Sequence, residues 1–355
     1  MNAKQLRRRR AASQLLYRSE PLSPEQVVGH MLCVQAQDRR GGRLALRARS
    51  EAFDAAGVEH ALAVERSLIF TWVMRGTIHL IRPDELPWLL AVFAPVRAKE
   101  NLRRLRGDGI SEERANEGVR IIDNVLREEG PLSRADLRER LLAASFPSEG
   151  QALPHVIGVS AYAGVSVVGP QQSGKAMHVS ASDWLGTDIA AQIAKVDREK
   201  ALAELARRCL ESRGPASVVD MAYWTGLPQR DILRGLDAIA PQLTELADGL
   251  LDLKSKTVEE LGPLPARLLH TWDDYMLSWK DRSFMLPDEH KRAVIWGGGM
   301  FASTATVDGL VKGGWSAPVA RKPFSVEIDE FEPLGKKAIA ELERDAADIA
   351  RFEGR

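Results

Sequence analysis

One pattern recurs three times along this chain of 355 residues and constrains its fold more than any other. Each copy has a proline, a small or apolar residue, a serine and, three residues after the serine, Gln or Asp. Serine followed three residues later by Gln is the capping box that begins a helix, and Asp is a weaker version of it. The three boxes pair Ser23 with Gln26, Ser133 with Asp136, and Ser217 with Asp220.

Each box stands in the same surroundings. Helical periodicity predicts helices before the boxes over residues 5–18, 117–129 and 199–211, and apolar residues at helical spacing follow each box. Alternating β residues then predict three hairpins, which pair 68–73 with 77–81, 165–169 with 176–179, and 243–246 with 250–253. Two helices followed by a hairpin are typical of a winged helix, so we expect an α+β fold of tandem winged-helix repeats.

The character of the chain changes near Gly262. Short β runs at 294–296, 305–307 and 310–311, with an Asp308-Gly309 turn, predict a small mostly-β module. A last helix is expected to bury one apolar face, made of Ile339, Leu342, Ala346, Ile349 and Phe352. The predicted parts are 1–112 (winged helix 1, with the first wing), 113–195 (winged helix 2), 196–261 (winged helix 3) and 262–355 (the β module and the last helix).

The chain has the composition of a cytoplasmic protein. It has two cysteines without metal-type spacing, no secretory signal and no apolar run of about 18 residues, so we expect neither a disulfide framework nor a membrane span. The net charge is zero, but basic residues gather early and acidic ones late. The early cluster is Lys4, Arg7, Arg8, Arg9, Arg10, Arg18, Arg39, Arg40, Arg43, Arg47 and Arg49. A second cluster lies over 97–106, and the pattern favours a polyanion-binding face over solvated helix surfaces.

Gln35-Ala36-Gln37 is the strongest candidate for chemistry. It follows apolar residues and runs into Asp38 and an arginine cluster. Glutamine both donates and accepts hydrogen bonds, so the pair can hold water next to cations that hold phosphate. In a helix the two side chains would point about 200° apart, and they converge only in an extended segment or at a helix end. Gly41-Gly42 predicts such an end nearby.

Other motifs give DNA-binding candidates. Residues 169–176 resemble a phosphate-binding loop, but Ala176 replaces the magnesium-binding Ser or Thr and β residues lie on both sides, so we interpret Lys175 as a phosphate contact on a wing tip. Alternation places Arg75, Thr77 and His79 on one strand face, where they contact DNA or form a polar outer face. The histidines lack metal spacing, and we expect no metal and no cofactor.

An aromatic and charged stretch, 272–282, has two possible roles. Its tryptophans and tyrosine can stack on bases or pack against another part of the protein. We favour packing, because Trp and Tyr commonly combine an apolar body with a satisfied polar tip at interfaces.

Together these motifs resemble the AlkZ/YcaQ family of bacterial winged-helix proteins, several of which are DNA glycosylases. The resemblance rests on Gln35-Ala36-Gln37, on Arg-Gly-Thr-Ile-His at 75–79, and on the segments 281–283 and 307–309, and it spans residues 5–320. It implies that Gln35 and Gln37 excise alkylated bases, in the AlkZ-like variant of the motif. The family commonly has a proline after the acidic residue, where this chain has Arg39.

The resemblance implies a monomeric, monofunctional DNA glycosylase. Its substrate would be double-stranded DNA that contains bulky N7-alkylguanine-type lesions or interstrand crosslinks, in general repair or in self-resistance to a genotoxin. Arg39, Arg40, Arg43, Arg75, Thr77, His79 and Lys175 are the expected DNA contacts. Asp38 is an alternative base, and the alternative function is a non-catalytic winged-helix regulator, which would dimerise on a palindrome.

Overall fold

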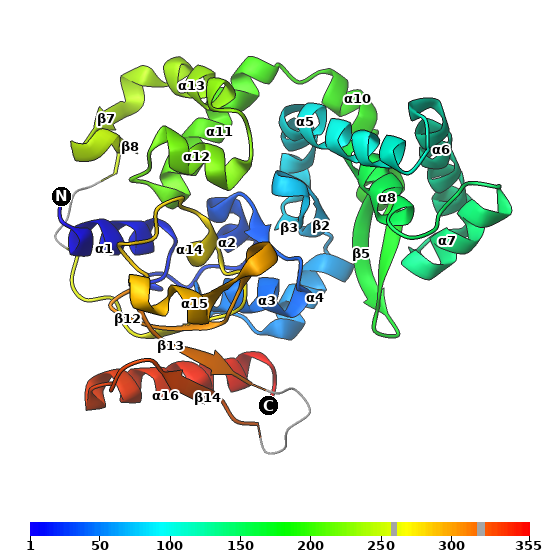
Figure 1. Cartoon of the computed structure of the whole chain (residues 1–355). Helices are drawn as coiled ribbons and strands as arrows, with labels where there is room; N and C mark the ends of the chain where they lie inside the picture. The colour runs from blue at the N-terminus through cyan, green and yellow to red at the C-terminus, as the bar shows by residue number, and fades with distance from the viewer. Residues whose placement is uncertain (257–260, 318–323) are drawn as a thin grey trace. The chain divides into compact units, whose positions relative to one another are not determined.

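The computed structural model describes residues 1–256, 261–317 and 324–355 (Figure 1). The chain forms two compact units. Unit 1 comprises Met1–Val58 and Ala203–Arg355, and unit 2 comprises Glu59–Leu202. The chain passes between them within helix α4 (Ala55–Ala63) and again within α11 (Arg198–Arg213). The finer division into four parts stays a prediction.

Unit 2 contains one complete copy of the repeated pattern. In chain order this copy is α6 (Glu112–Glu129), β4 (Leu132–Ser133), α7 (Arg134–Ala143), α8 (Ala152–Tyr162), β5 (Ser166–Gln172) and β6 (Lys175–Ser180). The rest of the unit is β2 (Ile69–Trp72), β3 (Ile78–Ile81), α5 (Leu86–Gly107), α9 (Ala181–Leu185) and α10 (Ile189–Ala194). The capping box of Ser133 and Asp136 begins α7, as predicted.

The strands of unit 2 lie in the order β3-β2-β5-β6-β4. Both predicted hairpins are confirmed as antiparallel pairs, with Thr71 opposite His79 and Val167 opposite Val179. The long β5–β6 hairpin (Figure 1) turns at Ser173 and Gly174, which both have positive φ, as a two-residue hairpin turn requires. The helices α5 to α8 enclose a core that includes Ile122, Leu137 and Phe146.

Unit 1 contains a second copy with the same order of elements. It consists of α11, α12 (Val218–Thr225), α13 (Gln229–Ala238), β7 (Leu243–Glu245) and β8 (Leu251–Leu253). Ala216 precedes the capping serine and bridges to Leu251 on β8, just as β4 pairs with β6 in unit 2. The box of Ser217 and Asp220 and the third hairpin are confirmed.

The first capping box also lies in unit 1. Ser23 and Gln26 form it at the start of α2 (Pro24–Met31), after helix α1 (Ala3–Ser13). The segment that follows contains β1 (Val34–Gln35) and α3 (Arg39–Arg47). The hairpin of this first copy, β2–β3, belongs to unit 2.

The predicted β module belongs to unit 1. Its main sheet has the order β14-β13-β12-β9, made of β9 (Arg267–Leu269), β12 (Thr304–Val307), β13 (Leu310–Ser316) and β14 (Glu327–Glu330). Asp308 and Gly309 form the predicted turn, both with positive φ. Beside the sheet are α14 (Asp274–Leu277), α15 (Lys291–Val294) and a small hairpin of β10 (Ile295–Trp296) and β11 (Met300–Phe301).

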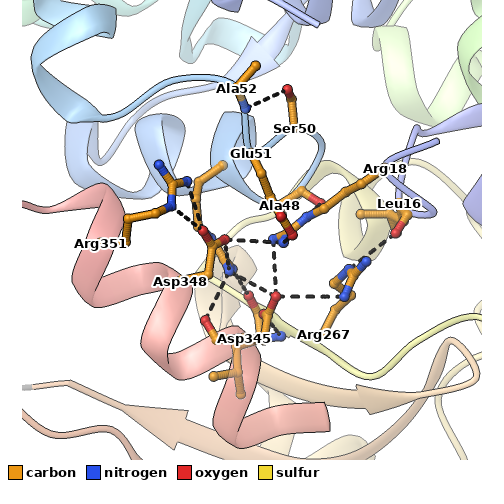
Figure 2. A network of polar contacts seen from close by, with 12 residues as sticks. Leu16, Arg18, Ala48, Ser50, Glu51, Ala52, Arg267, Asp345, Asp348 and Arg351 are labelled. Atoms are coloured by element: carbon orange, nitrogen blue, oxygen red, sulfur yellow. Dashed lines mark hydrogen bonds and ion pairs between the residues drawn. The ribbon is translucent and has the colours of Figure 1, made fainter. Parts of the chain in front are cut away.

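The last helix, α16 (Lys336–Phe352), buries Leu342, Ile349 and Phe352 as predicted. The prediction of the apolar face is wrong at Ile339, which is 37% exposed. The helix instead buries Asp345, which is 3% exposed. Asp345 is buried because Arg18, Arg47 and Arg267 surround it (Figure 2). An ion-pair network therefore takes the place of an apolar residue on this face.

Candidate functional site

The Gln35-Ala36-Gln37 motif lies in the short link between two helices. Helix α2 ends at Met31, Leu32 has a left-handed φ of 64°, and β1 covers Val34–Gln35 before α3 begins at Arg39. Of the three residues, only Gln35 lies in the strand, and the chain bends at Gln37. Gln35 is only 7% exposed, whereas Gln37 is exposed.

The backbone of the motif is held from two sides. The Gln35 N–H donates to Oδ2 of Asp274 at 3.1 Å. On the other side, a Cβ added to Gly42 would stand 2.8 Å from Cβ of Ala36 and 3.4 Å from the Gln35 carbonyl oxygen. Ala36 is buried against this glycine, so the main chain between the two glutamines is tightly packed.

The prediction of a helix end at Gly41-Gly42 is wrong. Both glycines lie inside the first turns of α3 and are buried. They are needed for close approach rather than for a turn, since a Cβ on Gly41 would also stand 2.7 Å from Nδ1 of His270. Close packing of two segments is a tertiary feature, and glycine alone does not distinguish it from a helix end.

Asp38 caps α3. Its carboxylate accepts the N–H groups of Arg40 and Gly41, both at 3.2 Å, and Oδ2 lies 3.7 Å from Nδ1 of His270. Burial lowers the pKa of His270, although the nearby Asp38 acts in the opposite direction. The alternative base thus has a structural role as an N-cap, next to a buried imidazole that favours its neutral form.

The early arginine cluster does not form the predicted polyanion-binding face. Most of its guanidinium groups bond to acidic groups within unit 1. The pairs are Arg7 and Arg8 with Asp308, Arg9 with Asp252, Arg10 with Asp220, Arg18 with Glu51 and Asp345, Arg40 with Glu353, Arg47 with Asp345, and Arg49 with Asp273. Early bases and late acids are complementary because the two ends of the chain fold into one unit.

Three predicted DNA contacts lie on α3, next to the glutamines. Arg39, Arg40 and Arg43 are partly buried, and Nε of Arg40 lies 2.5 Å from Oε1 of Glu353. They lie one, two and five residues after Asp38, within the first two turns of α3, and so adjoin the motif. Their contact with DNA stays a prediction.

The predicted contacts on the first hairpin do not share a strand face. Arg75 lies in the turn between β2 and β3 with a φ of 53°, and Thr77 directly precedes β3. His79, on β3, is fully buried, and its Nδ1 lies 3.0 Å from the Thr77 carbonyl oxygen. The prediction that these three side chains alternate along one strand is wrong, because the strand begins only at Ile78. His79 therefore presents no surface to DNA in this structure.

Two exposed basic features remain in unit 2. Lys175 is exposed at the tip of the β5–β6 hairpin, as expected of a wing tip. On the last turns of α5, Lys99, Arg103, Arg104 and Arg106 are also exposed.

Sequence reasoning missed the residues that support the motif. The packing role favoured for the 272–282 stretch is confirmed for its central part, since residues 273–279 are buried and Tyr275 and Trp279 pack edge to face with centroids 5.6 Å apart. Within it, Asp273 bonds both Nη atoms of Arg49 at 2.9 Å, and Asp274 bonds Arg213 at 2.9 Å. The available signal was the pair of adjacent acidic residues within an aromatic stretch. Acidic residues are buried only when a basic partner pairs with them, so these two indicated buried ion pairs.

Comparison with known proteins identifies the class. The family model of the AlkZ-like DNA glycosylases matches residues 28–352, so the chain belongs to this family. The interstrand DNA cross-link repair glycosylase of Streptomyces sahachiroi is 28% identical over 95% of this chain and 92% of its own length. The solved structure of the DNA glycosylase AlkZ from the same organism matches all of this chain and 97% of that one, with a TM-score of 0.82 and 23% identity.

The protein is therefore a DNA glycosylase, a hydrolase of N-glycosyl bonds that acts on DNA. Family membership decides for the enzyme over the non-catalytic regulator. Among residues 1–256, 261–317 and 324–355, no helix is long and apolar enough to cross a bilayer.

Proposed function

We propose that this enzyme removes bulky N7-alkylguanine-type purines, or unhooks interstrand crosslinks, and that Gln35 and Gln37 carry out the hydrolysis. The substrate class is supported by the relative from S. sahachiroi, which is named as an interstrand cross-link repair glycosylase and matches nearly the whole chain. We further propose a monofunctional enzyme that acts as a monomer on DNA in the bacterial cytoplasm.

The observation that carries the proposal is the shape of the Gln35-Ala36-Gln37 segment. The exposed Gln37 follows a buried Gln35 whose main chain is held by Asp274 and packed under α3. An exposed amide on a fixed backbone is what a group needs to place a water molecule reproducibly. Precise placement of reactants is itself a large part of catalysis.

The chemistry requires no acid to protonate the leaving group. Glycoside hydrolases usually supply one, but a purine alkylated at N7 is already cationic and leaves as a neutral base. The enzyme has to position water against C1′ and stabilise an oxocarbenium-like sugar. Amide carbonyl oxygens provide partial negative charge for both tasks. We assign the water to Gln37 and the orientation of the water or the sugar to Gln35.

We propose that the repeated element order forms winged helices that bind the DNA backbone. The copy in unit 2 and the copy at α11–β8 share a helix, two further helices and a hairpin. The link after the first helix pairs with the second hairpin strand, through β4 in unit 2 and through the single bridge of Ala216 in the other copy. Lys175 on the hairpin tip, Arg75 and Thr77 beside the first hairpin turn, and Arg39, Arg40 and Arg43 on α3 are the proposed DNA contacts.

The test is base release from duplex DNA that carries a series of lesions, from N7-methylguanine up to a nitrogen-mustard crosslink. Wild type is compared with Gln35→Ala and Gln37→Ala, and alkali reveals abasic sites. We expect strand breaks only after alkali with the wild type, and strongly reduced release with both variants. Gel filtration at assay concentration is expected to give a monomer.

The lesion series separates the parts of the proposal. Release of crosslinked or bulky purines at higher rates than of N7-methylguanine is expected. A preference for the small methyl lesion would overturn the substrate class, and full activity of both glutamine variants would overturn the catalytic assignment.

A further inference from the structure

One buried ion pair holds the chain immediately before the glutamines. Arg213, the last residue of α11, is 1% exposed. Its Nη1 donates to the Met31 carbonyl at 2.8 Å, and its Nη2 donates to the Cys33 carbonyl at 3.2 Å and to Oδ1 of Asp274 at 2.9 Å. The second oxygen of Asp274 accepts the Gln35 N–H at 3.1 Å. One pair thus fixes main-chain groups of three residues from 31 to 35.

This stretch needs an external support. Leu32 has φ 64° and ψ −55°, a conformation that a leucine adopts only when its surroundings impose it. β1 is two residues long and cannot set the path of the chain by itself. The support comes from residues distant in sequence, on α11 and at the start of α14.

The pair is poorly explained as a source of stability alone. Burial lowers the pKa of Arg213, and Asp274 offsets that effect only in part. Removing two charges from water is costly, and buried pairs are frequently replaced by apolar residues without loss of stability. The guanidinium also lies over the Trp224 ring, 3.6 Å from its centroid, which locks its position. A planar guanidinium group held in one position is suited to fixing the positions of the main-chain groups that it bonds.

We propose that Arg213 and Asp274 are positioning residues for base excision: they fix the main chain that leads into Gln35 and so determine where the two glutamine amides stand. The inference rests on the proposed function of the glutamines. Neither residue touches the DNA or the reacting atoms in this proposal. They act through the backbone of residues 31 to 35.

The structure supplies a matched control in the same unit. Like Asp274, Asp345 contacts an arginine with one oxygen and a backbone N–H with the other: Oδ1 lies 3.0 Å from Nη1 of Arg47, and Oδ2 accepts the Leu268 N–H at 2.8 Å. Unlike Asp274, it also pairs with Arg18 and Arg267. Both side chains of this pair are buried, and Figure 2 shows Asp345 within its network. The control pair joins the last residue of α3, ten positions beyond Gln37, to β9 and α16.

The experiment compares Asp274→Asn and Arg213→Lys with Asp345→Asn and Arg47→Lys. Asparagine keeps one side-chain oxygen and replaces the other with NH2, which cannot accept, so either the contact with the arginine or the contact with the backbone N–H loses its acceptor atom. Lysine keeps the charge but loses the planar fork, and Arg213→Lys remains informative if Asp274→Asn does not fold. The readouts are the single-turnover excision rate, the Kd for lesion DNA, the Tm and amide exchange at Gln35.

We expect Asp274→Asn and Arg213→Lys to lower the single-turnover rate by roughly 10- to 100-fold with unchanged Kd, and to speed exchange of the Gln35 amide. The control variants are expected to lower Tm while they keep rate and exchange. Equal single-turnover excision rates in the Asp274 and Arg213 variants and in the control variants, at a temperature where all of them are folded, would overturn the inference. Full activity of Gln35→Ala and Gln37→Ala would instead show that the proposed function itself fails, whatever the exchange data show.

Discussion

Gly42 gives a sharp test of how closely the glutamine segment must be held. A methyl group at this position would stand 2.8 Å from Cβ of Ala36 and 3.2 Å from its Cα. Ordinary contact between carbon atoms is about 3.5–4.0 Å, so Gly42→Ala has to move the segment by roughly 0.7–1.2 Å. The neighbour is backbone and a short side chain, which cannot rotate away.

The expected effect on the rate exceeds the effect on stability. Overpacking costs about 1–3 kcal/mol, and replacing a helical glycine by alanine returns about 1 kcal/mol. The free energy of unfolding should therefore fall by about 0–2 kcal/mol. A displacement of about 1 Å in a catalytic group can cost 100-fold, so the single-turnover excision rate should fall by up to about 100-fold.

Gly57→Ala is the control. Gly57 belongs to unit 1 and lies in the first turn of α4. Its added Cβ would meet Asp54 Oδ1 at 3.5 Å and Phe53 Cβ at 3.6 Å, which are ordinary contacts. This variant should gain up to about 1 kcal/mol from helix propensity and keep its rate. A wild-type rate in Gly42→Ala, or equal losses in both variants, would refute the reasoning.

Three further predictions concern folding and DNA binding. Burial lowers the pKa of His178 to about 4. Between pH 6.5 and pH 4 the unfolded chain therefore binds more protons than the folded chain, so the free energy of unfolding decreases as the pH is lowered, by up to about 3 kcal/mol below pH 4. Urea midpoints measured from pH 7 to 4 should show a weaker pH dependence in His178→Gln than in the wild type. Ser217→Ala removes a helix cap and should lower the free energy of unfolding by about 1 kcal/mol in urea titrations, with no change if the box is dispensable. Lys175→Gln should reduce the slope of log K against log salt by about 0.9 in DNA-binding titrations, and an unchanged slope would exclude a phosphate contact.

The elements of this fold were largely predictable because their signals are local. The three capping boxes formed at Ser23, Ser133 and Ser217, and the hairpins paired where alternation and turn residues placed them. The third helix of each complete copy, α8 and α13, was not predicted. A buried helix such as α8 is apolar on most sides and lacks the amphipathic signal.

What surrounds the glutamines was not predictable because it is tertiary. Gly41 and Gly42 predicted a helix end, but both are helical. Their missing side chains allow His270 and Ala36 to approach the backbone of α3 closely. The early arginines predicted a DNA-binding face, but most of their acidic partners lie some 200 to 330 residues later in the chain. Charge counts cannot show which bases and acids meet, since that depends on the whole chain path.

The supporting residues follow the same rule. Nothing local links Asp274 with Gln35, which stand 239 residues apart. The sequence alone identified the glutamines by their pattern and could not identify what holds them. Only the folded chain shows that the motif is a short link held by contacts from α3, α11 and α14.

The central claim is that an amide, not a carboxylate, carries the chemistry. The most direct measurement is the single-turnover release of an N7-alkylguanine by Gln37→Ala and Asp38→Asn side by side. Asparagine is as good an N-cap as aspartate, so Asp38→Asn removes the charge and keeps an oxygen for one of the two N–H groups that Asp38 caps at the start of α3. The account predicts near wild-type release by Asp38→Asn and a large loss in Gln37→Ala. The reverse pattern would make Asp38 the base and contradict the account.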